Sequence, residues 1–282
     1  DNLSFKRQGM TRRSTPCLFH ANLFALGGGR EDLSDSVIGK DKIRIGMEAA
    51  YAPYNWQVSE ASEYTIPIDN VQGAYADGYD VQIAKIVCKA LGGEPVAVKQ
   101  SFSGLIDSLN NGQIDLIIAG MSATLEREES VGFSDPYFIG YFGLFVKEGS
   151  PYQSATKLSD FSGATVLGQK DTMLDTVIDE IPGVVHKNPV DSVPTVFSNL
   201  LQGTCDAVTY NTENEKGYMA QNPGIVPIRF AEGEGFKQEV AANVGCRKGS
   251  DKLLKLIDKT LKGVSQEERD QMWDACLDRQ PA

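Results

Sequence analysis

The sequence has few of the residues that build metal sites and hydrolytic sites. Its 282 residues include two histidines and five cysteines, and no two cysteines have the Cys-x-x-Cys spacing typical of a zinc site. Neither His20 nor His186 has a local pattern that indicates a Ser-His-Asp or Cys-His arrangement. Gly27–Gly29 lacks the Lys-Ser/Thr that follows a phosphate-binding loop. We therefore expect no metal, no cofactor and no catalytic residues.

Basic residues and long apolar runs are also scarce. Lys and Arg total 27 against 38 Asp and Glu, which gives a net charge of -11. Nucleic-acid-binding surfaces need clustered basic residues, so we expect no nucleic-acid partner. No run approaches the roughly 18 apolar residues that a membrane-spanning helix needs. The length and the 41% hydrophobic content are enough for two domains with their own cores.

The five cysteines leave their pairing open. An odd number means that at least one thiol is free or is paired with another chain. Cys88 lies on the apolar face of an expected helix and is interpreted as a core residue. Pairing among Cys205, Cys246 and Cys276 is compatible with an oxidising compartment, and the sequence does not choose between the pairs.

Residues 1–40 show neither the periodicity of a domain nor a complete targeting signal. The apolar run Leu18–Leu26 resembles part of a secretory leader, but His20 and Asn22 interrupt it. We interpret this region as a leader remnant or flexible N-terminal segment, with Gly27–Gly29 as a flexible joint.

The rest of the chain alternates strands and helices in two successive runs. The first run is predicted as strand Lys42–Met47, helix Tyr79–Leu91, strand Pro95–Lys99, helix Gly104–Asn111 and strand Asp115–Ile118. After an extended segment at Tyr141–Lys147, the second run is strand Thr165–Leu167, helix Asp171–Glu180, strand Val184–His186, helix Val193–Gln202, strand Asp206–Tyr210 and helix Glu213–Gln221. The last elements are strand Val240–Arg247 and helices Asp251–Lys262 and Gln266–Cys276. Helices that connect parallel strands predict two α/β lobes.

The segment that follows the strand Asp115–Ile118 has the chemistry of a carboxylate-binding site. Small and hydroxyl residues occupy Ala119–Ser122, Thr124 is a suitable helix N-cap, and Arg127 falls in the first turn of a short helix. A guanidinium can form a bidentate pair with a carboxylate, and free backbone N–H groups beside it can donate to the same carboxylate. The alternative is an ordinary helix cap with a surface arginine.

Six stretches of the chain match a known family in order and spacing. They are Ile43–Tyr54, Gly78–Ala84, Ser101–Ile106, Asn111–Asp115, Ala119–Arg127 with Phe133–Tyr137, and Gly203–Val208. Together they resemble the family 3 solute-binding proteins of bacterial polar amino-acid ABC transporters, over about residues 42–280. The resemblance implies an α/β, two-lobed periplasmic-binding-protein-like (type II) fold. Its lobe 1 is expected at 41–146 with 242–282 and its lobe 2 at 147–241. Crossovers near Val146 and Ala241 would form a hinge, and the ligand would lie in the cleft between the lobes.

The resemblance also implies roles for individual residues in binding an amino acid. Arg127, Ser122 and the backbone N–H groups around Asp171 and Thr172 would hold the α-carboxylate, and the Gly120 carbonyl would accept from the α-amino group. The complete set of expected ligand-binding residues is Glu48, Tyr51, Trp56, Phe102, Ala119, Gly120, Met121, Ser122, Arg127, Gln169, Asp171, Thr172 and Asn211.

The expected side-chain pocket favours a cationic ligand. Tyr51 and Phe102 would sandwich the ligand side chain, with Tyr54 and Trp56 near the mouth of the cleft. Glu48 would read the far end of the ligand by pairing with an ammonium or guanidinium group, or by accepting from an amide. The alternatives are core packing for the aromatic residues and a solvated loop carboxylate for Glu48.

Two positions depart from the family pattern. Asn211 occupies the position where the family commonly has an acid for the α-ammonium, and Asp171 occupies a position that is usually glycine. Glu213 or Glu215 could supply the missing charge, or the ligand could carry a modified amino group. The Asp171 carboxylate would repel an incoming carboxylate unless it turned away or paired with Lys170.

The expected function is delivery of lysine, arginine or ornithine to a membrane-embedded ABC permease. The protein would act as an extracytoplasmic monomer, either periplasmic or a cell-surface lipoprotein. The first alternative is a binder of glutamine or of another polar or modified amino acid. The second is a cyclohexadienyl dehydratase-like enzyme, with Glu213 as its candidate acid. A sensory ligand-binding module is the third, and it would need a fused membrane or signalling segment.

Overall fold

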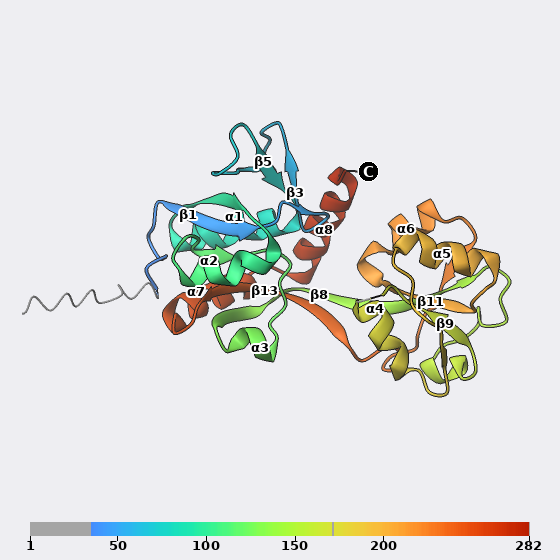
Figure 1. Cartoon of the computed structure of the whole chain (residues 1–282). Helices are drawn as coiled ribbons and strands as arrows, with labels where there is room; N and C mark the ends of the chain where they lie inside the picture. The colour runs from blue at the N-terminus through green and yellow to red at the C-terminus, as the bar shows by residue number, and fades with distance from the viewer. Residues whose placement is uncertain (1–34, 171, 282) are drawn as a thin grey trace, which may run out of the picture. The chain divides into compact units, whose positions relative to one another are not determined.

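The computed structural model describes residues 35–170 and 172–281 (Figure 1). Its strands are β1 (Lys42–Met47), β2 (Ala50–Tyr51), β3 (Asn55–Val58), β4 (Ile66–Pro67), β5 (Tyr75–Asp77), β6 (Glu94–Lys99), β7 (Leu116–Ile117), β8 (Val131–Lys147), β9 (Thr165–Leu167), β10 (Val185–His186), β11 (Ala207–Asn211), β12 (Ile225–Pro227) and β13 (Glu239–Arg247). Its α-helices are α1 (Tyr79–Leu91), α2 (Leu105–Asn110), α3 (Leu125–Glu128), α4 (Met173–Thr176), α5 (Val193–Gln202), α6 (Glu215–Gln221), α7 (Asp251–Lys262) and α8 (Gln266–Arg279). Short 3-10 helices are η1 (Phe102–Gly104), η2 (Leu158–Phe161), η3 (Val177–Glu180) and η4 (Thr212–Asn214).

Lobe 1 is built on the parallel strands β1, β6 and β7. β1 pairs with β6 along its whole length and with β7 at Ile45 and Gly46. The helix α1 ends at Gly92, whose left-handed conformation lets its N–H reach the Cys88 and Lys89 carbonyls. Val81, Ile83, Ala84 and Val87 of α1 are fully buried in the core that also receives α7 and α8.

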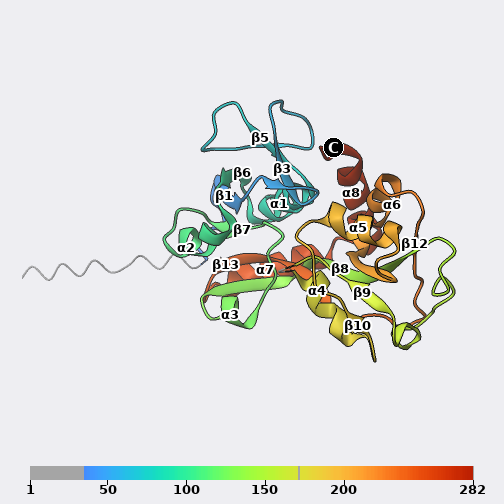
Figure 2. The ribbon, with the colours of Figure 1, turned by 45° about the vertical axis from the view of Figure 1, so that its right-hand side comes forward.

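Lobe 2 is built on the parallel strands β10, β9 and β11, whose two faces are covered by different helices. Phe145 and Val208 point toward α5 and α6, whereas Leu144, Val146 and Ala207 belong to the core formed with η2 and η3. Side chains of a strand alternate between its faces, which explains this division. Figure 2 shows α5 and α6 together on one side of these strands.

The strand β8 joins the two lobes. From Val131 to Tyr141 it pairs antiparallel with β13, and from Phe142 to Lys147 it pairs with β11 and β12. The sheet order is therefore β10-β9-β11-β8-β13-β7-β1-β6, with β12 paired to β8. β8 changes partner between Tyr141 and Phe142, several residues before the predicted crossover at Val146.

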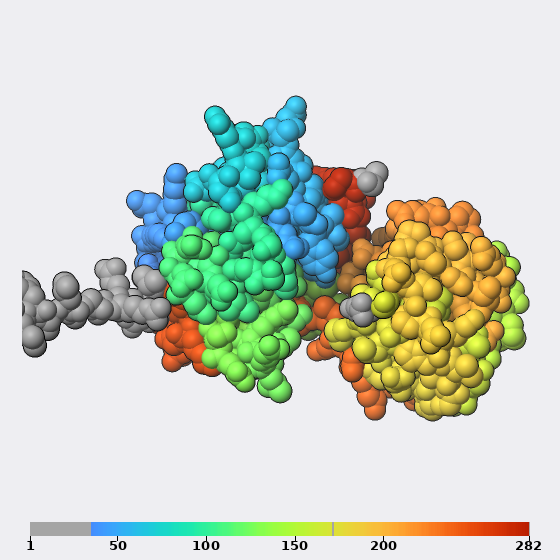
Figure 3. Space-filling model, in the orientation of Figure 1, coloured from blue at the N-terminus to red at the C-terminus, as the bar shows by residue number. Residues whose placement is uncertain are grey.

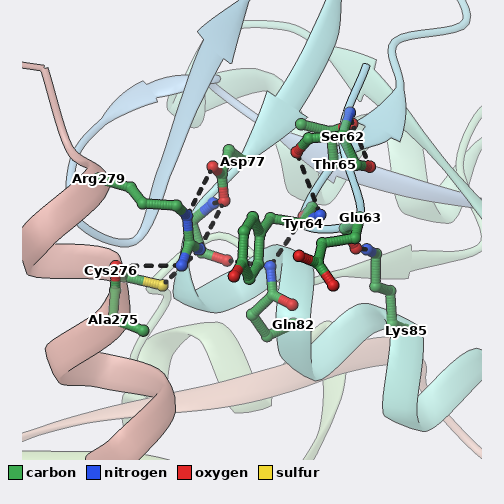
Figure 4. Close-up of polar contacts among 11 residues, drawn as sticks. Ser62, Glu63, Tyr64, Thr65, Asp77, Gln82, Lys85, Ala275, Cys276 and Arg279 are labelled. Carbon is green, nitrogen blue, oxygen red and sulfur yellow. Dashed lines mark hydrogen bonds and ion pairs between the residues drawn. The ribbon is translucent and has the colours of Figure 1, made fainter.

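A second, four-stranded sheet with the order β2-β3-β5-β4 covers one end of lobe 1. Arg279 of α8 anchors it, because its guanidinium donates to both Asp77 carboxylate oxygens at 2.9 and 3.1 Å. The same guanidinium lies 3.8 Å from the centre of the Tyr64 ring (Figure 4). Gln82 of α1 donates to the Tyr64 carbonyl at 2.8 Å. The space-filling view shows the end of α8 at the surface beside this blue segment (Figure 3).

The structure differs from the sequence-based elements at several places. β8 begins at Val131 rather than at Tyr141, and β12 was not predicted. The helix predicted at Glu213–Gln221 is divided into η4 and α6. The four-stranded sheet was not predicted, because strands of two to four residues carry no periodic pattern. The helix predicted at Asp171–Glu180 is divided into α4 and η3. Val37, in the segment predicted to be flexible, is 1% exposed in the lobe 1 core, and the Asp35 carboxylate accepts from the Leu253 N–H near the start of α7. Residues 1–34 of that segment lie outside the described residues.

Candidate functional site

The candidate residues lie at the carboxyl ends of the strands. In lobe 1, Glu48 follows β1, Phe102 follows β6, and Ala119–Ser122 follow β7. In lobe 2, Gln169 follows β9, and Asn211 is the last residue of β11. Parallel neighbouring strands end at the same edge of a sheet, so each lobe presents its candidates along one edge.

Arg127 is held by uncharged groups. Its guanidinium donates to the Ser122 carbonyl at 2.9 Å and lies 5.3 Å from the centre of the Phe102 ring. Thr124 caps the helix α3 by accepting from the Arg127 N–H at 3.2 Å. Among the described residues, no carboxylate lies within ion-pair distance of this guanidinium. The remaining guanidinium N–H groups can therefore take a carboxylate from outside the chain.

Ser122 connects this segment to the returning strand β13. Its hydroxyl donates to the Ala241 carbonyl at 2.6 Å, and the neighbouring Ala123 N–H donates to the Asn243 side chain at 3.1 Å. The hydroxyl was predicted to hold a ligand carboxylate, but its single proton is already used within the chain. A role for Ser122 in binding a carboxylate would therefore use its backbone N–H.

Glu48 and Phe102 are hydrogen-bonded to each other. The Glu48 Oε1 accepts from the Phe102 N–H at 3.3 Å, which joins the end of β1 to η1. The next residue, Ala49, has a φ of 53°, in the left-handed region that costs a non-glycine residue about 1–3 kcal/mol. The surrounding contacts hold the chain in this conformation as it turns toward Tyr51.

Tyr51 and Tyr54 form a stacked pair against Gly120. Their ring centres are 4.8 Å apart with 22° between the planes, and Tyr51 is 45% exposed whereas Tyr54 is 6% exposed. Gly120 has a φ of 63°, and a Cβ there would lie 3.0 Å from Cε1 of Tyr51. Only glycine therefore allows both this backbone conformation and this close contact.

A pocket of about 390 Å³ brings part of the candidate set together. Tyr51 and Tyr54 of lobe 1 line it together with Gln169, Thr172 and Asn211 of lobe 2. Its full lining is Tyr51, Ala52, Pro53, Tyr54, Phe142, Gln169, Thr172, Met173, Leu174, Asn211, Glu213, Asn214, Tyr218 and Val240. The other candidates that the structure describes, including Glu48, Phe102 and Arg127, are not part of this lining.

Thr172 begins the helix α4 beside this pocket. Its hydroxyl accepts from the Leu174 N–H at 3.2 Å and donates to the Gln169 carbonyl at 2.8 Å. The threonine thus caps the helix and closes the loop that leads from β9. Asp171, the candidate between them, lies outside the described residues.

Three candidates are buried. Ala119 and Met121 are each 1% exposed, so only their backbone groups are placed to contact a ligand. Trp56 is 4% exposed within the lobe 1 core, whereas it was predicted near the mouth of the cleft. It alternates with the exposed Gln57 on β3, so the pleat of the strand turns the indole inward.

A buried acid that was not among the predicted ligand-binding residues lies close to Gly120. Asp80 is fully buried and accepts from the Tyr137 hydroxyl at 2.5 Å and from the Asn55 amide at 2.8 Å. The Gly120 N–H in turn donates to the Tyr137 hydroxyl at 3.2 Å. Burial raises the pKa of Asp80 to about 7, although both side-chain hydrogen bonds oppose this shift. The sequence signal for Asp80 was its position two residues after Gly78, in the matching stretch Gly78–Ala84.

Glu213 is a second acid with a raised pKa. It lines the 390 Å³ pocket and also an adjoining one of about 760 Å³. Burial raises the pKa of its carboxyl to about 7. The sequence placed Glu213 two residues after Asn211 but did not indicate its burial.

The chain's relatives identify its family. Residues 43–274 match the bacterial extracellular solute-binding proteins, family 3. The chain belongs to this family. A probable histidine-binding protein of Campylobacter jejuni is 27% identical to this solute-binding protein over 238 residues, 83% of either chain. The ABC transporter glutamine-binding protein GlnH of Bacillus subtilis is 29% identical over 219 residues, 76% of this chain and 78% of GlnH.

The solved structures agree on the fold. An ancestral arginine-binding protein bound to arginine is 28% identical, with a TM-score of 0.52, and the match covers 84% of this chain and 98% of that one. The solute-binding protein therefore has the two-lobed type II fold, as its sequence predicted.

Other features of the described residues concern metals, membranes and thiols. No cluster of three or more histidine, cysteine, aspartate or glutamate residues there could hold a metal ion. No helix in the same ranges is long and apolar enough to cross a membrane. Cys88, Cys205, Cys246 and Cys276 are each free and buried, so the disulfides left open by the sequence are not formed among them.

Proposed function

We propose that this solute-binding protein binds a cationic amino acid between its lobes and delivers it to the membrane-embedded permease of an ABC transporter. The observation that carries the proposal is the Arg127 guanidinium, which is oriented by the Ser122 carbonyl and the Phe102 ring. A guanidinium in this setting suits the α-carboxylate that all amino acids share.

The cationic preference rests on the residues around the expected side-chain position. The Glu48 carboxylate lies beside Phe102, and Tyr51 presents a partly exposed ring. A desolvated cation over an aromatic ring gains on the order of 2 kcal/mol. Glutamine stays the alternative, because a carboxylate can also accept from an amide, and the relatives include histidine-, glutamine- and arginine-binding proteins.

The lobes would act as two bodies that close on the ligand. We assign 41–146 with 242–282 to lobe 1 and 147–241 to lobe 2, with β8 and β13 as the hinge. The protein would work outside the cytoplasm as a monomer, in a periplasm or attached to the cell surface as a lipoprotein.

Isothermal titration of the ligand-stripped protein tests this proposal. The panel is arginine, lysine, ornithine, histidine, glutamine and cystine, with thermal unfolding as a second measurement. A ligand at 100 times its Kd adds about 2.7 kcal/mol to the free energy of unfolding. Binding confined to arginine, lysine or ornithine supports the proposal. Tight glutamine binding without arginine binding would exclude the cationic preference, and no binding by any amino acid would exclude the function.

One observation favours a dehydratase as the second candidate. A carboxylic acid with a pKa of about 7, such as the half-buried Glu213, can donate a proton near neutral pH. Incubation with prephenate followed by chromatography tests this activity. Product above the level of a Glu213→Gln variant would support it, and product at the background level would remove it.

A further inference from the structure

Glu213 lies where a side chain can contact a ligand, and its carboxylate can carry a charge that the neutral Asn211 amide cannot. It lies in η4, directly after the end of β11, and lines the 390 Å³ pocket together with Asn211, Tyr51 and Tyr54. After burial, the charge of Glu213 is the next largest cause of the raised pKa of Tyr54, so the carboxylate lies near this ring. The acid therefore belongs to the same cavity as both tyrosines.

The Glu213 carboxylate has an oxygen without a partner. Its Oε2 is buried and has no hydrogen-bond donor among the described residues. An unsatisfied buried carboxylate oxygen is costly, because desolvation is not offset by a hydrogen bond or an opposite charge. Glu215, the next acid along the chain, is already used by the Arg229 guanidinium at 2.5 and 2.8 Å and by the Tyr210 hydroxyl. Glu213 is thus the one of the two that remains available for a ligand.

The groups packed around Glu213 do not neutralise it. On β8, Gly140 offers no side chain, and a Cβ there would lie 3.0 Å from Oε2. On α8, the Trp273 indole N–H reaches only the backbone carbonyl of Glu213, at 3.5 Å. Arg269 of α8 donates to the backbone carbonyls of Pro136, Val264 and Leu261. The remaining charged residues of the adjoining 760 Å³ pocket are Glu215, Lys216, Arg229, Asp270 and Asp274.

We propose that Glu213 is the anionic partner for a cationic group of the bound amino acid, in place of the acid that Asn211 does not provide. A ligand ammonium or guanidinium group in the cavities that Glu213 lines would give Oε2 its missing donor and an opposite charge. Glu213 is then a determinant of ligand specificity. The inference rests on the proposed function, since it requires an amino-acid ligand.

Titration of Glu213→Gln with arginine at pH 8 tests this assignment. We expect arginine to bind at least tenfold more weakly than to the wild type, because the amide removes the charge and keeps the size. The Tm of the ligand-free variant should equal or exceed that of the wild type, because a buried carboxylate no longer has to ionise. A purely structural role for Glu213 would instead lower this Tm. Glu232→Gln, an exposed loop residue of lobe 2 with the same change of charge, should bind arginine normally.

The pH profile provides a second readout. A cation that pairs with ionised Glu213 binds more tightly as the carboxyl loses its proton, so wild-type affinity should rise about tenfold from pH 6 to pH 8. The profile of Glu213→Gln should be flat. Asp80 and His186 also have raised pKa values. If Glu213→Gln keeps the wild-type pH profile, that profile arises from one of these two groups and the inference is overturned.

Citrulline separates the two possible cationic groups, since it keeps the α-ammonium but lacks the guanidinium charge. If Glu213→Gln loses affinity equally for arginine and citrulline, Glu213 pairs with the α-ammonium group. If it loses affinity for arginine alone, Glu213 pairs with the ligand side chain. If Glu213→Gln binds arginine as tightly as the wild type at pH 8, the inference is overturned and the proposed function stands. Failure of the wild type to bind any amino acid overturns the proposed function itself.

Discussion

At the scale of single residues, the candidate site depends on side chains whose shape matters as much as their charge. The planar guanidinium of Arg127 lies over the Phe102 ring on one side and still donates to the Ser122 carbonyl. A lysine ammonium is a point charge and cannot form the bidentate pair that a carboxylate makes with arginine.

We expect Arg127→Lys to weaken arginine binding at least tenfold. Hydrogen bonds to charged groups contribute about 1.5–3 kcal/mol each, and the variant loses at least one of them. Titration calorimetry measures the change, and the Tm of the ligand-free protein should stay the same within error. Glu126→Gln, exposed on the same short helix, is the control and should bind normally. Equal affinity of Arg127→Lys and wild type would show that Arg127 does not contact the ligand.

Gly120 is required for both its backbone conformation and its contact with Tyr51. Gly120→Ala should lower the free energy of unfolding by about 1–3 kcal/mol and weaken ligand binding, because the new Cβ displaces the Tyr51 ring. Gly149→Ala is a matched control, since Gly149 also has a positive φ of 80° but a Cβ there would meet no atom within 4 Å. Denaturant titration of both variants separates the backbone cost, which they share, from the clash at Tyr51. The same loss of stability and no loss of affinity in both variants would contradict the argument.

At the scale of elements, the last helix holds the sheet that carries Tyr51. The strand β2 contains Tyr51 and pairs with β3, β3 pairs with β5, and Asp77 of β5 is bound by Arg279 of α8. The Asp77 side chain is only 7% exposed, so removal of the guanidinium would leave a nearly buried carboxylate without its basic partner. The order of β2–β5 is thus coupled to the position of α8.

We expect Arg279→Ala to lower the free energy of unfolding by about 2 kcal/mol. This is less than for a fully buried pair, because the Arg279 side chain is 22% exposed. Hydrogen exchange should increase in residues 59–77 before it increases in β1 or β6. Asp278→Asn changes a neighbour on α8 that makes no ion pair with the described residues, and it should leave both measurements unchanged. Uniform exchange across lobe 1 in Arg279→Ala would argue against a local anchor.

At the scale of the whole molecule, the fully buried Asp80 and the half-buried Glu213 link stability to pH. Burial raises the pKa of both Asp80 and Glu213 to about 7. A carboxyl whose pKa is higher in the folded than in the unfolded state stabilises the fold below its unfolded pKa, and this contribution is lost as the pH rises through the folded value. His186 acts in the same direction, because hydrogen bonds to Asp175 and Asp179 raise its pKa against the effect of burial.

The ligand-free protein should therefore become less stable between pH 5 and pH 8. The shift of Asp80 alone corresponds to about 4 kcal/mol at most, at about 1.4 kcal/mol per pKa unit. Denaturant unfolding at several pH values measures the slope, and Asp80→Asn should make it shallower. Asp115 and Glu215, whose pKa values are lowered by their basic partners, affect stability only below this range. A stability that rises from pH 5 to pH 8 would contradict the raised pKa values of both acids.

The sequence by itself determined the elements whose signals are local. β1, α1, α5 and α7 have the bounds that the apolar periodicity and the flanking residues predicted. Glycines such as Gly92 and Gly203 end their helices through a left-handed conformation that needs no distant contact. The order of the matching stretches also indicated the family and the two-lobed fold, because both depend on the succession of elements along the chain.

Only the tertiary structure decided which of the candidate side chains are free to act. Trp56 is buried by the pleat of a strand that is too short to be predicted from periodicity. The Ser122 hydroxyl donates to a carbonyl more than a hundred residues away in the chain. The unpaired Oε2 of Glu213 depends on groups from β8 and α8 that lie far from it in the chain. Burial and hydrogen bonding are properties of these long-range contacts, so no local pattern in the sequence could determine them.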